Sequence, residues 1–311
     1  MQPPPEYQKL LTDFPGLFRE QEPLAPLVRF RVGGPADLFC QPQDLDTLRA
    51  VVTHADKKEI PLFVMGDGTN LLVQDGGMRG LVLRLGKGFK EIRVDGDCLY
   101  AGCAAKLPRV CLHAAGQGLA GLEGLSGIPG TVGGAIAMNA GTPESTACET
   151  LESLKVCEPD GLIRVLGKEA FRFAYRRFYW EDGTPLEKRI LLEACWRLRK
   201  GEAQILRQQI RQALRRRKAC QPVAAASAGC IFKNPCADMP AGRLIDEAGF
   251  KGMQRGDAMV SPRHANFIIN QGKARASDIL SLITWIQEQI LETQGILLEK
   301  EVRIVGETSP V

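Results

Sequence analysis

The sequence contains no apolar run that approaches the roughly 20 residues needed to cross a bilayer. Its first residues, Met1 to Glu6, lack the basic stretch followed by an apolar one that directs a chain to export. We therefore expect a cytoplasmic protein that does not bind a membrane. With 311 residues, 44% hydrophobic and 24% charged, the composition is typical of a globular protein with two or three domains.

Histidine is scarce, and the cysteines lack the spacing typical of zinc sites. The three histidines, His54, His113 and His264, cannot form a metal site or a Ser-His-Asp triad by their spacing. The ten cysteines include no C-x-x-C pair, so we expect no metal, and most of them should be small buried apolar residues. Any demanding chemistry should therefore come from an organic cofactor.

Strong charge and the common nucleotide-binding patterns are also missing. The formal net charge is only +4, and its densest basic cluster, Arg211 to Lys218, indicates a solvated helix face, so we expect no nucleic-acid partner. The Walker pattern is absent, which argues against an ordinary nucleoside triphosphatase. The Rossmann spacing of glycines followed by a helix is absent as well.

Hydrophobic periodicity indicates a mixed α and β protein. Helical spacing predicts helices over 44–58, from about 107 to 114, and from about 277 to 294. Short apolar runs predict strands at 62–65, 71–73, 81–85, 91–94, 98–101, 154–158, 190–198, 265–269 and 302–305. The composition changes at Lys200-Gly201, where a long polar helix begins, and we place a domain boundary there.

Two glycine-rich stretches can bring backbone amides close to a ligand. The first is Gly66-Asp67-Gly68-Thr69-Asn70, which follows a strand and is itself followed by Leu71. The second lies within residues 121–141 and contains Gly127, Ile128, Pro129, Gly130, Thr131, Gly133 and Gly134. Free N–H groups in such turns hold phosphates, and two stretches about 60 residues apart suit a dinucleotide such as FAD. A set of purely structural turns is the alternative interpretation.

Three further segments carry groups that could act on a substrate. The stretch from Ser227 to Pro235 places a thiol, an ammonium and an amide close together, at Cys230, Lys233 and Asn234. Tyr175 and Arg176 follow an aromatic run, and Glu301 opens the last predicted strand. The alternatives are a buried core thiol for Cys230 and solvated surface charge for the others.

Seven segments, in order from Phe30 to Gly306, resemble the UDP-N-acetylenolpyruvoylglucosamine reductases, the MurB family of UDP-N-acetylmuramate dehydrogenases. They begin at Arg31, Gly66, Gly127, Tyr175, Gly229, Ala241 and Glu301. The resemblance implies an α+β fold, with a two-subdomain FAD-binding fold of the vanillyl-alcohol oxidase (PCMH) type followed by a smaller α/β substrate-binding domain. It implies an FAD-binding region at 1–200, with a subdomain boundary near 86–90, and a substrate domain at 201–311.

The resemblance also implies an activity. A member of this family is an FAD-dependent oxidoreductase that uses NADPH to reduce UDP-N-acetylglucosamine enolpyruvate to UDP-N-acetylmuramate. This reaction belongs to peptidoglycan precursor biosynthesis, and so to cell wall biogenesis, cell shape and cell division. The partners implied are the UDP-sugar enolpyruvyl ether and NADPH, and we expect a monomer.

The residues that match the family's motifs carry implied roles. Gly66 to Leu71 and Gly127 to Gly134 would bind FAD, and Tyr175, Lys233 and Asn234 would face the UDP-sugar or NADPH. Arg176, Cys230 and Glu301 match the catalytic positions. The sequence departs from the family at Cys230, where serine is commoner as the proton donor, and after Met138, where the usual Gly-Ala-Tyr-Gly is missing. The chain also resembles the subtype without an extra substrate-covering loop.

These matches suggest a mechanism, with two alternatives still open. Arg176 would attract the substrate carboxylate, Glu301 would orient or polarise it, and Cys230 would protonate the carbon next to it. One alternative is an FAD oxidase or dehydrogenase acting on an alcohol or hydroxy acid. The other is a non-catalytic protein that binds a nucleotide-sugar or flavin.

Overall fold

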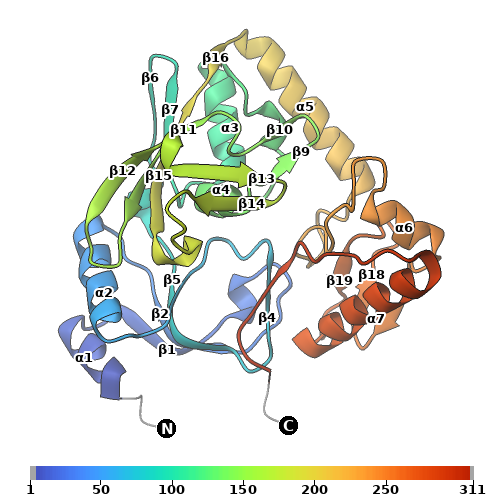
Figure 1. The fold of residues 1–311 in the computed structure, drawn as a ribbon, viewed down its shortest axis with the longest axis horizontal. Coiled ribbons are helices and arrows are strands. Elements are labelled where there is room, and N and C mark those ends of the chain that lie inside the picture. The colour runs from blue at the N-terminus through green and yellow to red at the C-terminus, as the bar shows by residue number, and fades with distance from the viewer. Residues whose placement is uncertain (1–4, 309–311) are drawn as a thin grey trace. The chain divides into compact units, whose positions relative to one another are not determined.

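A computed structural model describes residues 5–308, which fold into two compact units of helices and strands (Figure 1). The first unit comprises Met1–Glu20, Leu38–Gly66 and Gly80–Arg216. The second comprises Gln21–Asp37, Asp67–Arg79 and Arg217–Val311. Because these units interleave along the chain, they do not test the sequential division at residue 200, which stays a prediction.

The helices predicted at 44–58, 107–114, from Lys200-Gly201 onward and at 277–294 are all present, whereas the three short helices at 5–13, 132–137 and 241–247 were not predicted. The helices are α1 Pro5–Asp13, α2 Leu45–Lys57, α3 Leu107–Gly116, α4 Val132–Ala137, α5 Ala203–Cys220, α6 Ala241–Glu247 and α7 Ala276–Gln294. In α2 the Asp44 carboxylate accepts a hydrogen bond from the Thr47 N–H at 2.8 Å, which satisfies a free amide at the helix start. Helix α7 ends at Gly295, whose φ of 69° is readily available only to glycine.

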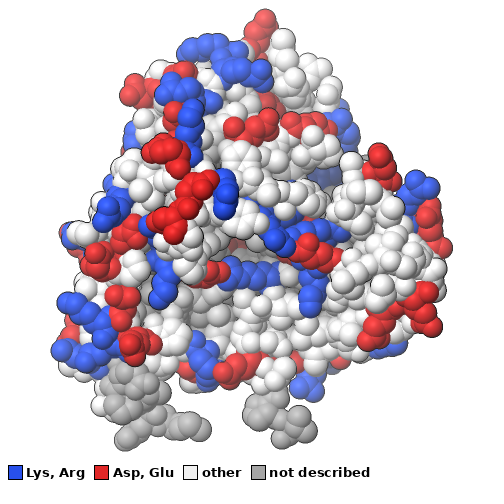
Figure 2. All heavy atoms as spheres, in the orientation of Figure 1, with Lys and Arg blue, Asp and Glu red and all other residues white. Residues whose placement is uncertain are grey.

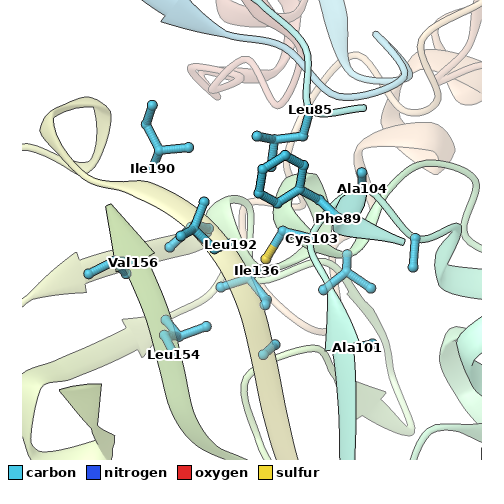
Figure 3. Close-up of a cluster of buried hydrophobic side chains, with 14 of the residues drawn as sticks. Leu85, Phe89, Ala101, Cys103, Ala104, Ile136, Leu154, Val156, Ile190 and Leu192 are labelled. Carbon is cyan, nitrogen blue, oxygen red and sulfur yellow. The ribbon is translucent and has the colours of Figure 1, made fainter. Parts of the chain in front are cut away.

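A five-stranded antiparallel sheet forms the centre of the first unit. Its order is β12-β11-β15-β7-β6. The strands are β6 Ile92–Asp95, β7 Cys98–Gly102, β11 Leu151–Cys157, β12 Ile163–Gly167 and β15 Ile190–Arg197. One face packs on the core, where Leu154, Val156 and Leu192 lie near Ile136 of α4 (Figure 3). The opposite face carries polar side chains, as expected for an antiparallel sheet with one face solvated.

The core of this unit also contains a buried tryptophan at the end of β15. Trp196 is fully buried, and its indole Nε1 donates a hydrogen bond to the Ala147 carbonyl at 2.8 Å. A partner for the indole N–H is needed because an unpaired buried donor destabilises the fold.

The shorter strands form smaller sheets. A four-stranded sheet has the order β1-β2-β5-β3, with β3 and β5 parallel. Its strands are β1 Phe18–Pro23, β2 Pro35–Cys40, β5 Met78–Leu83 and β3 Leu62–Val64. The remaining pairs are β8 Leu119–Ala120 with β16 Arg199–Lys200, β9 Gly141–Thr142 with β10 Ser145–Thr146, and β13 Phe171–Ala174 with β14 Arg177–Trp180.

The second unit has its own core around α7. The buried stripe of α7 includes Ile279, Ile283, Ile286 and Ile290, as the helical spacing predicted. A three-stranded antiparallel sheet combines β17 Gln254–Arg255, β18 Ala258–Val260 and β19 Ile268–Asn270. Strand β4 Leu71–Val73 pairs in parallel with β20 Arg303–Val305. Strand β19 begins three residues later than the strand predicted at 265–269, because 264–267 form a turn in which the Phe267 N–H donates to the His264 carbonyl at 3.0 Å.

The cysteines and surface charges agree with the sequence analysis in most respects. None of the ten cysteines, which all lie within residues 5–308, forms a disulfide, and six of them are buried. Acidic and basic side chains are interspersed on the visible surface (Figure 2). Among residues 5–308 no helix is long and apolar enough to cross a membrane. In the same part of the chain no group of three or more His, Cys, Asp or Glu side chains could hold a metal ion.

Candidate functional site

The two glycine-rich stretches meet in the first unit, through Gly66 and Thr131. A β-carbon added at Gly66 would lie 2.5 Å from the Thr131 Oγ1, far inside a normal contact. That hydroxyl accepts a hydrogen bond from the Gly134 N–H at 3.4 Å and so caps the start of α4. Only a glycine at position 66 allows the two segments to approach this closely.

The backbone of the second stretch is fixed against the end of β7. The Val132 and Gly133 N–H groups donate to the carbonyls of Ala105 and Cys103 at 2.9 and 3.0 Å. The Gly130 carbonyl accepts from the Leu107 N–H at 3.0 Å. Gly134, in the first turn of α4, is exposed. The amides at this helix start are thus paired within the chain, and the segment offers a cofactor a fixed backbone surface without bulky side chains.

This approach of Gly66 to Thr131 can be tested by a double-mutant cycle. We expect Gly66→Ala to weaken FAD binding by at least about tenfold, because the added methyl group forces the two segments apart. A tenfold loss corresponds to about 1.4 kcal/mol of binding free energy. Adding Thr131→Ala removes the clashing hydroxyl and should recover part of that loss. Flavin titration of both single variants and the double variant checks this, and purely additive losses would contradict it.

The remainder of the first stretch, Asp67 to Leu71, lies in the second unit. Gly68 has a φ of 60°, and a β-carbon there would lie 2.8 Å from the Val28 Cα. Asp67, Thr69 and Asn70 share the turn that leads into β4. The Asn70 side-chain amide donates to the Glu301 carbonyl at 3.0 Å, and the Asn70 carbonyl accepts from the Arg303 N–H at 3.0 Å. Pairing of β4 with β20 thus places predicted cofactor residues beside a predicted catalytic one.

The backbone segments that carry Cys230 and Glu301 are hydrogen-bonded to each other. The Glu301 N–H donates to the Ile231 carbonyl at 2.7 Å, so residues 70 apart in sequence become neighbours in the fold. Cys230 is half-buried and follows Gly229, whose φ is 81°. The predicted thiol is therefore not part of a packed core, in contrast to the six buried cysteines.

An asparagine that the sequence analysis did not single out holds the Cys230 segment. Asn266 is 2% exposed. Its Oδ1 accepts from the Phe232 N–H at 2.9 Å, and its Nδ2 donates to the Phe232 carbonyl at 2.8 Å. The Asn266 carbonyl also accepts from the Ile231 N–H at 2.9 Å. The sequence signal for this role was a polar residue within an apolar run that was predicted to form a strand at 265–269.

Lys233 and Asn234, predicted to bind substrate, both have structural partners. The Lys233 ammonium lies 2.6 Å from Glu299 Oε1, and the Lys233 side chain is only 10% exposed. The Asn234 Oδ1 accepts from the Ala241 N–H at 3.1 Å, at the start of α6. These contacts orient both side chains, and their roles in binding substrate stay predictions.

Arg217 was expected on a solvated face, and the structure corrects this. Its four basic neighbours Arg211, Arg215, Arg216 and Lys218 are exposed, as predicted, but Arg217 is half-buried. Burial lowers the pKa of the Arg217 guanidinium, while interactions with the thiols of Cys230 and Cys220 raise it. The spacing of Arg217 from the buried residues Leu206 and Ile210 places it on the inner stripe of α5, a signal that the charge cluster obscured.

Tyr175 and Arg176 form the turn between β13 and β14 in the first unit. Arg176 has a φ of 58°, an uncommon conformation for a side-chain-bearing residue. Its Nη2 donates to the Gly141 carbonyl at 3.0 Å, and its Cζ lies 5.0 Å from the centre of the Tyr175 ring. The Asn139 side chain donates to the Ala174 carbonyl at 2.9 Å. The stretch that departs from the family pattern therefore positions this arginine.

Comparison with known proteins identifies the family. The family model for an FAD binding domain matches residues 36–167, and that for the UDP-N-acetylenolpyruvoylglucosamine reductase C-terminal domain matches 221–305. A curated UDP-N-acetylenolpyruvoylglucosamine reductase from Desulforamulus reducens is 40% identical over 294 residues, which cover 94% of this chain and 95% of the relative. The chain belongs to the UDP-N-acetylenolpyruvoylglucosamine reductase family. A relative of the same name from Heliobacterium modesticaldum is 39% identical over 300 residues, covering 96% of this chain and 94% of the relative.

A solved structure agrees with this assignment. The MurB structure from Thermus caldophilus is 37% identical, has a TM-score of 0.80, and the match covers 93% of this chain and 100% of that one. The predicted α+β FAD-binding fold followed by a C-terminal domain is thus confirmed, as is FAD as the cofactor. The close approach of Gly66 to Thr131 fits a cofactor of this kind.

Proposed function

We propose that this member of the UDP-N-acetylenolpyruvoylglucosamine reductase family reduces UDP-N-acetylglucosamine enolpyruvate to UDP-N-acetylmuramate with NADPH. FAD, which Gly66 to Leu71 and Gly127 to Gly134 would hold, would supply the hydride-transfer chemistry when bound. The observation that carries the proposal is the bond from the Glu301 N–H to the Ile231 carbonyl, 2.7 Å long, which places an acid beside the Cys230 segment in a family member. The name and activity of its relatives supply the substrate class.

The reaction makes two demands on the protein. Hydride addition at the terminal carbon of the enolpyruvyl group moves negative charge onto the carbon beside the carboxylate. That charge needs a nearby cation, and the carbon then needs a proton. The side chains of Arg176, Glu301 and Cys230 have the chemistry to meet these demands.

Arg176 supplies the positive charge. Its guanidinium carries five N–H donors, and the Gly141 carbonyl and the Tyr175 ring constrain its direction. A guanidinium that is already oriented loses less rotamer entropy when it binds a carboxylate. Glu301 orients or polarises the same substrate group, since its backbone is fixed by Ile231 and its carbonyl by Asn70.

Cys230 donates the proton to the carbon. A free thiol has a pKa of about 8.5, so at neutral pH it is mostly protonated and is a stronger acid than a serine hydroxyl. The thiolate left after transfer is stabilised by the nearby Arg217 guanidinium, and solvent returns the proton. Tyr175, Lys233 and Asn234 bind the UDP-sugar or NADPH, and Gly66 to Leu71 and Gly127 to Gly134 bind FAD.

The proposal extends to the cellular setting. The enzyme works in the cytoplasm as a monomer, without a nucleic-acid or membrane partner, in peptidoglycan precursor synthesis. The absence of a membrane-spanning helix among residues 5–308 is compatible with this setting. Analytical ultracentrifugation of the FAD-loaded protein would measure the oligomeric state directly.

A single assay tests the activity. We expect NADPH absorbance to fall rapidly only when the enolpyruvyl UDP-sugar is present, with one NADPH consumed for each molecule of UDP-N-acetylmuramate formed. Acid precipitation should release the flavin into the supernatant. Turnover of an alcohol or hydroxy acid with flavin retained in the pellet would instead indicate an oxidase, and binding without turnover would indicate a non-catalytic protein.

A further inference from the structure

The hairpin that carries Arg176 is a sheet of only two strands in the first unit (Figure 1). Strand β13 pairs with β14 over four residue pairs, the last of which is Ala174 with Arg177. Arg176 lies in the turn that follows this pair. A two-stranded hairpin is marginally stable by itself, so its contacts with the rest of the unit must set its direction. Those contacts therefore also set where the Arg176 guanidinium points.

An apolar cluster fixes the depth of the hairpin in the unit. Phe171, Phe178 and Trp180 are buried, and their ring centres lie 5.0 to 6.5 Å apart. On the outer side Arg172 and Tyr179 are exposed. Because the hydrophobic effect is not directional, burial of these rings restricts rotation of the hairpin less than it restricts its depth. Directional bonds at the two ends of the hairpin supply the remaining constraint.

At the open end of the hairpin, one guanidinium contacts both the hairpin and the five-stranded sheet. Arg189, directly before β15, donates from Nη1 and Nη2 to the two carboxylate oxygens of Asp182, at 3.1 and 2.5 Å. Its Nε donates to both carboxylate oxygens of Glu158, directly after β11, at 3.1 Å. Its Cζ lies 4.9 Å from the centre of the Trp180 ring. Arg189 thus links the end of β14 and the loop after it to the end of β11.

These three charged side chains, which we call the Arg189 clamp, are partly shielded from water. Arg189 and Glu158 are 13% and 14% exposed, whereas Asp182 is half-exposed. The hydrogen bond with Arg189 is the largest cause that lowers the pKa of the Asp182 carboxyl, so Asp182 is charged at neutral pH. Two parallel bonds between a guanidinium and a carboxylate fix a direction as well as a distance. A lysine, with one compact charge, cannot reproduce this geometry.

We propose that Arg189 is a positioning residue for Arg176 and acts on it through strand β14. Trp180 lies four residues after Arg176, so about 13 Å of extended strand separates the clamp from the turn. The turn is held at its own end, where the Asn139 side chain donates to the Ala174 carbonyl at 2.9 Å. Two separated anchors fix the direction of the hairpin, whereas one anchor leaves it able to rotate. The inference rests on the proposed role of Arg176 in substrate reduction.

Removal of the clamp tests this role in the FAD-loaded protein. Arg189→Met should slow reduction of the enolpyruvyl substrate by at least about tenfold, because a displacement of about 1 Å at a reacting group can cost about 10²-fold in rate. Flavin bleaching by NADPH should change much less, since Arg176 serves only the second half-reaction. Asp182→Asn should cause a loss of the same kind, and Arg189→Lys should retain part of the rate through one ion pair. Stopped-flow flavin absorbance follows both half-reactions, and thermal melting checks that each variant is folded.

A double-mutant cycle with Arg176 distinguishes positioning from a purely structural role. If Arg189 acts through Arg176, Arg189→Met should add less than about twofold to the loss already caused by Arg176→Ala. Losses that multiply independently would overturn the proposal. Normal substrate reduction by Arg176→Ala would show that the proposed role of Arg176 is wrong. A slow Arg176→Ala together with a normal Arg189→Met would overturn only the positioning role of Arg189.

Arg93→Met is the matched control on the same sheet. Arg93 also lies over an aromatic ring, with its Cζ 3.7 Å from the centre of the Tyr100 ring, and its Nη2 lies 3.0 Å from Glu193 Oε1. It belongs to β6, at the edge of the sheet opposite β12. Arg93→Met should leave both half-reactions unchanged. If it slows substrate reduction as much as Arg189→Met does, the loss reflects the sheet as a whole and the proposal is overturned.

Discussion

Cys230→Ala should leave NADPH-driven bleaching of the flavin almost unchanged and should slow reduction of the enolpyruvyl substrate by about 10²–10⁴-fold, the usual contribution of a general acid. The two half-reactions separate in this way because the thiol serves only the second. Hydride transfer from NADPH to the flavin requires no proton from Cys230. Stopped-flow measurements of flavin absorbance, first with NADPH alone and then with substrate added to the reduced enzyme, follow each half-reaction.

Two further variants control this experiment. Cys230→Ser should recover much of the lost rate, because a hydroxyl in the same place still carries a proton, although it is a weaker acid. Cys220→Ala removes an exposed thiol that also lies near Arg217, and it should leave both half-reactions unchanged. Normal turnover in Cys230→Ala would exclude the thiol as the proton donor.

Asn266→Ala should lower the free energy of unfolding by about 2–4 kcal/mol, because it leaves two buried polar groups of Phe232 without partners. These are the N–H that Asn266 Oδ1 accepts from at 2.9 Å and the carbonyl that Nδ2 donates to at 2.8 Å. The same bonds orient the backbone two residues after Cys230. We therefore expect substrate reduction to slow by at least about tenfold, while flavin bleaching by NADPH changes less.

Asn270→Ala is the matched control for this positioning role. Asn270 is also buried, at 8% exposure, and its Nδ2 donates to the Phe30 carbonyl at 2.9 Å. Its Oδ1 accepts from the Gly272 and Ala274 N–H groups, so its loss should destabilise the protein to a similar degree. Denaturant unfolding compares the two variants in stability, and stopped-flow kinetics compares them in chemistry. If both variants slow substrate reduction equally, Asn266 has only a structural role.

Some parts of the fold could be predicted from local sequence alone. Helix α2 has buried residues where the period of apolar side chains placed them, and Asp44 caps its start. Helix α7 repeats this agreement with its isoleucine stripe. Periodicity succeeds here because a helix buries one face, and that requirement acts within a few turns of the chain. The same reasoning misjudged Arg217, because a charged residue on the inner stripe resembles its solvated neighbours in sequence.

The glycine-rich stretches and the motifs from Arg31 to Glu301 were sufficient in sequence to indicate the family, and the comparisons confirmed it. The sequence alone indicated the cofactor class and the order of the segments, because each motif is contiguous in the chain. Only the tertiary structure decided that Glu301 lies beside the Cys230 segment and that Asn266 holds Phe232. These contacts join residues 34 and 70 positions apart, and they arise from strand pairing and core packing, which no local pattern encodes.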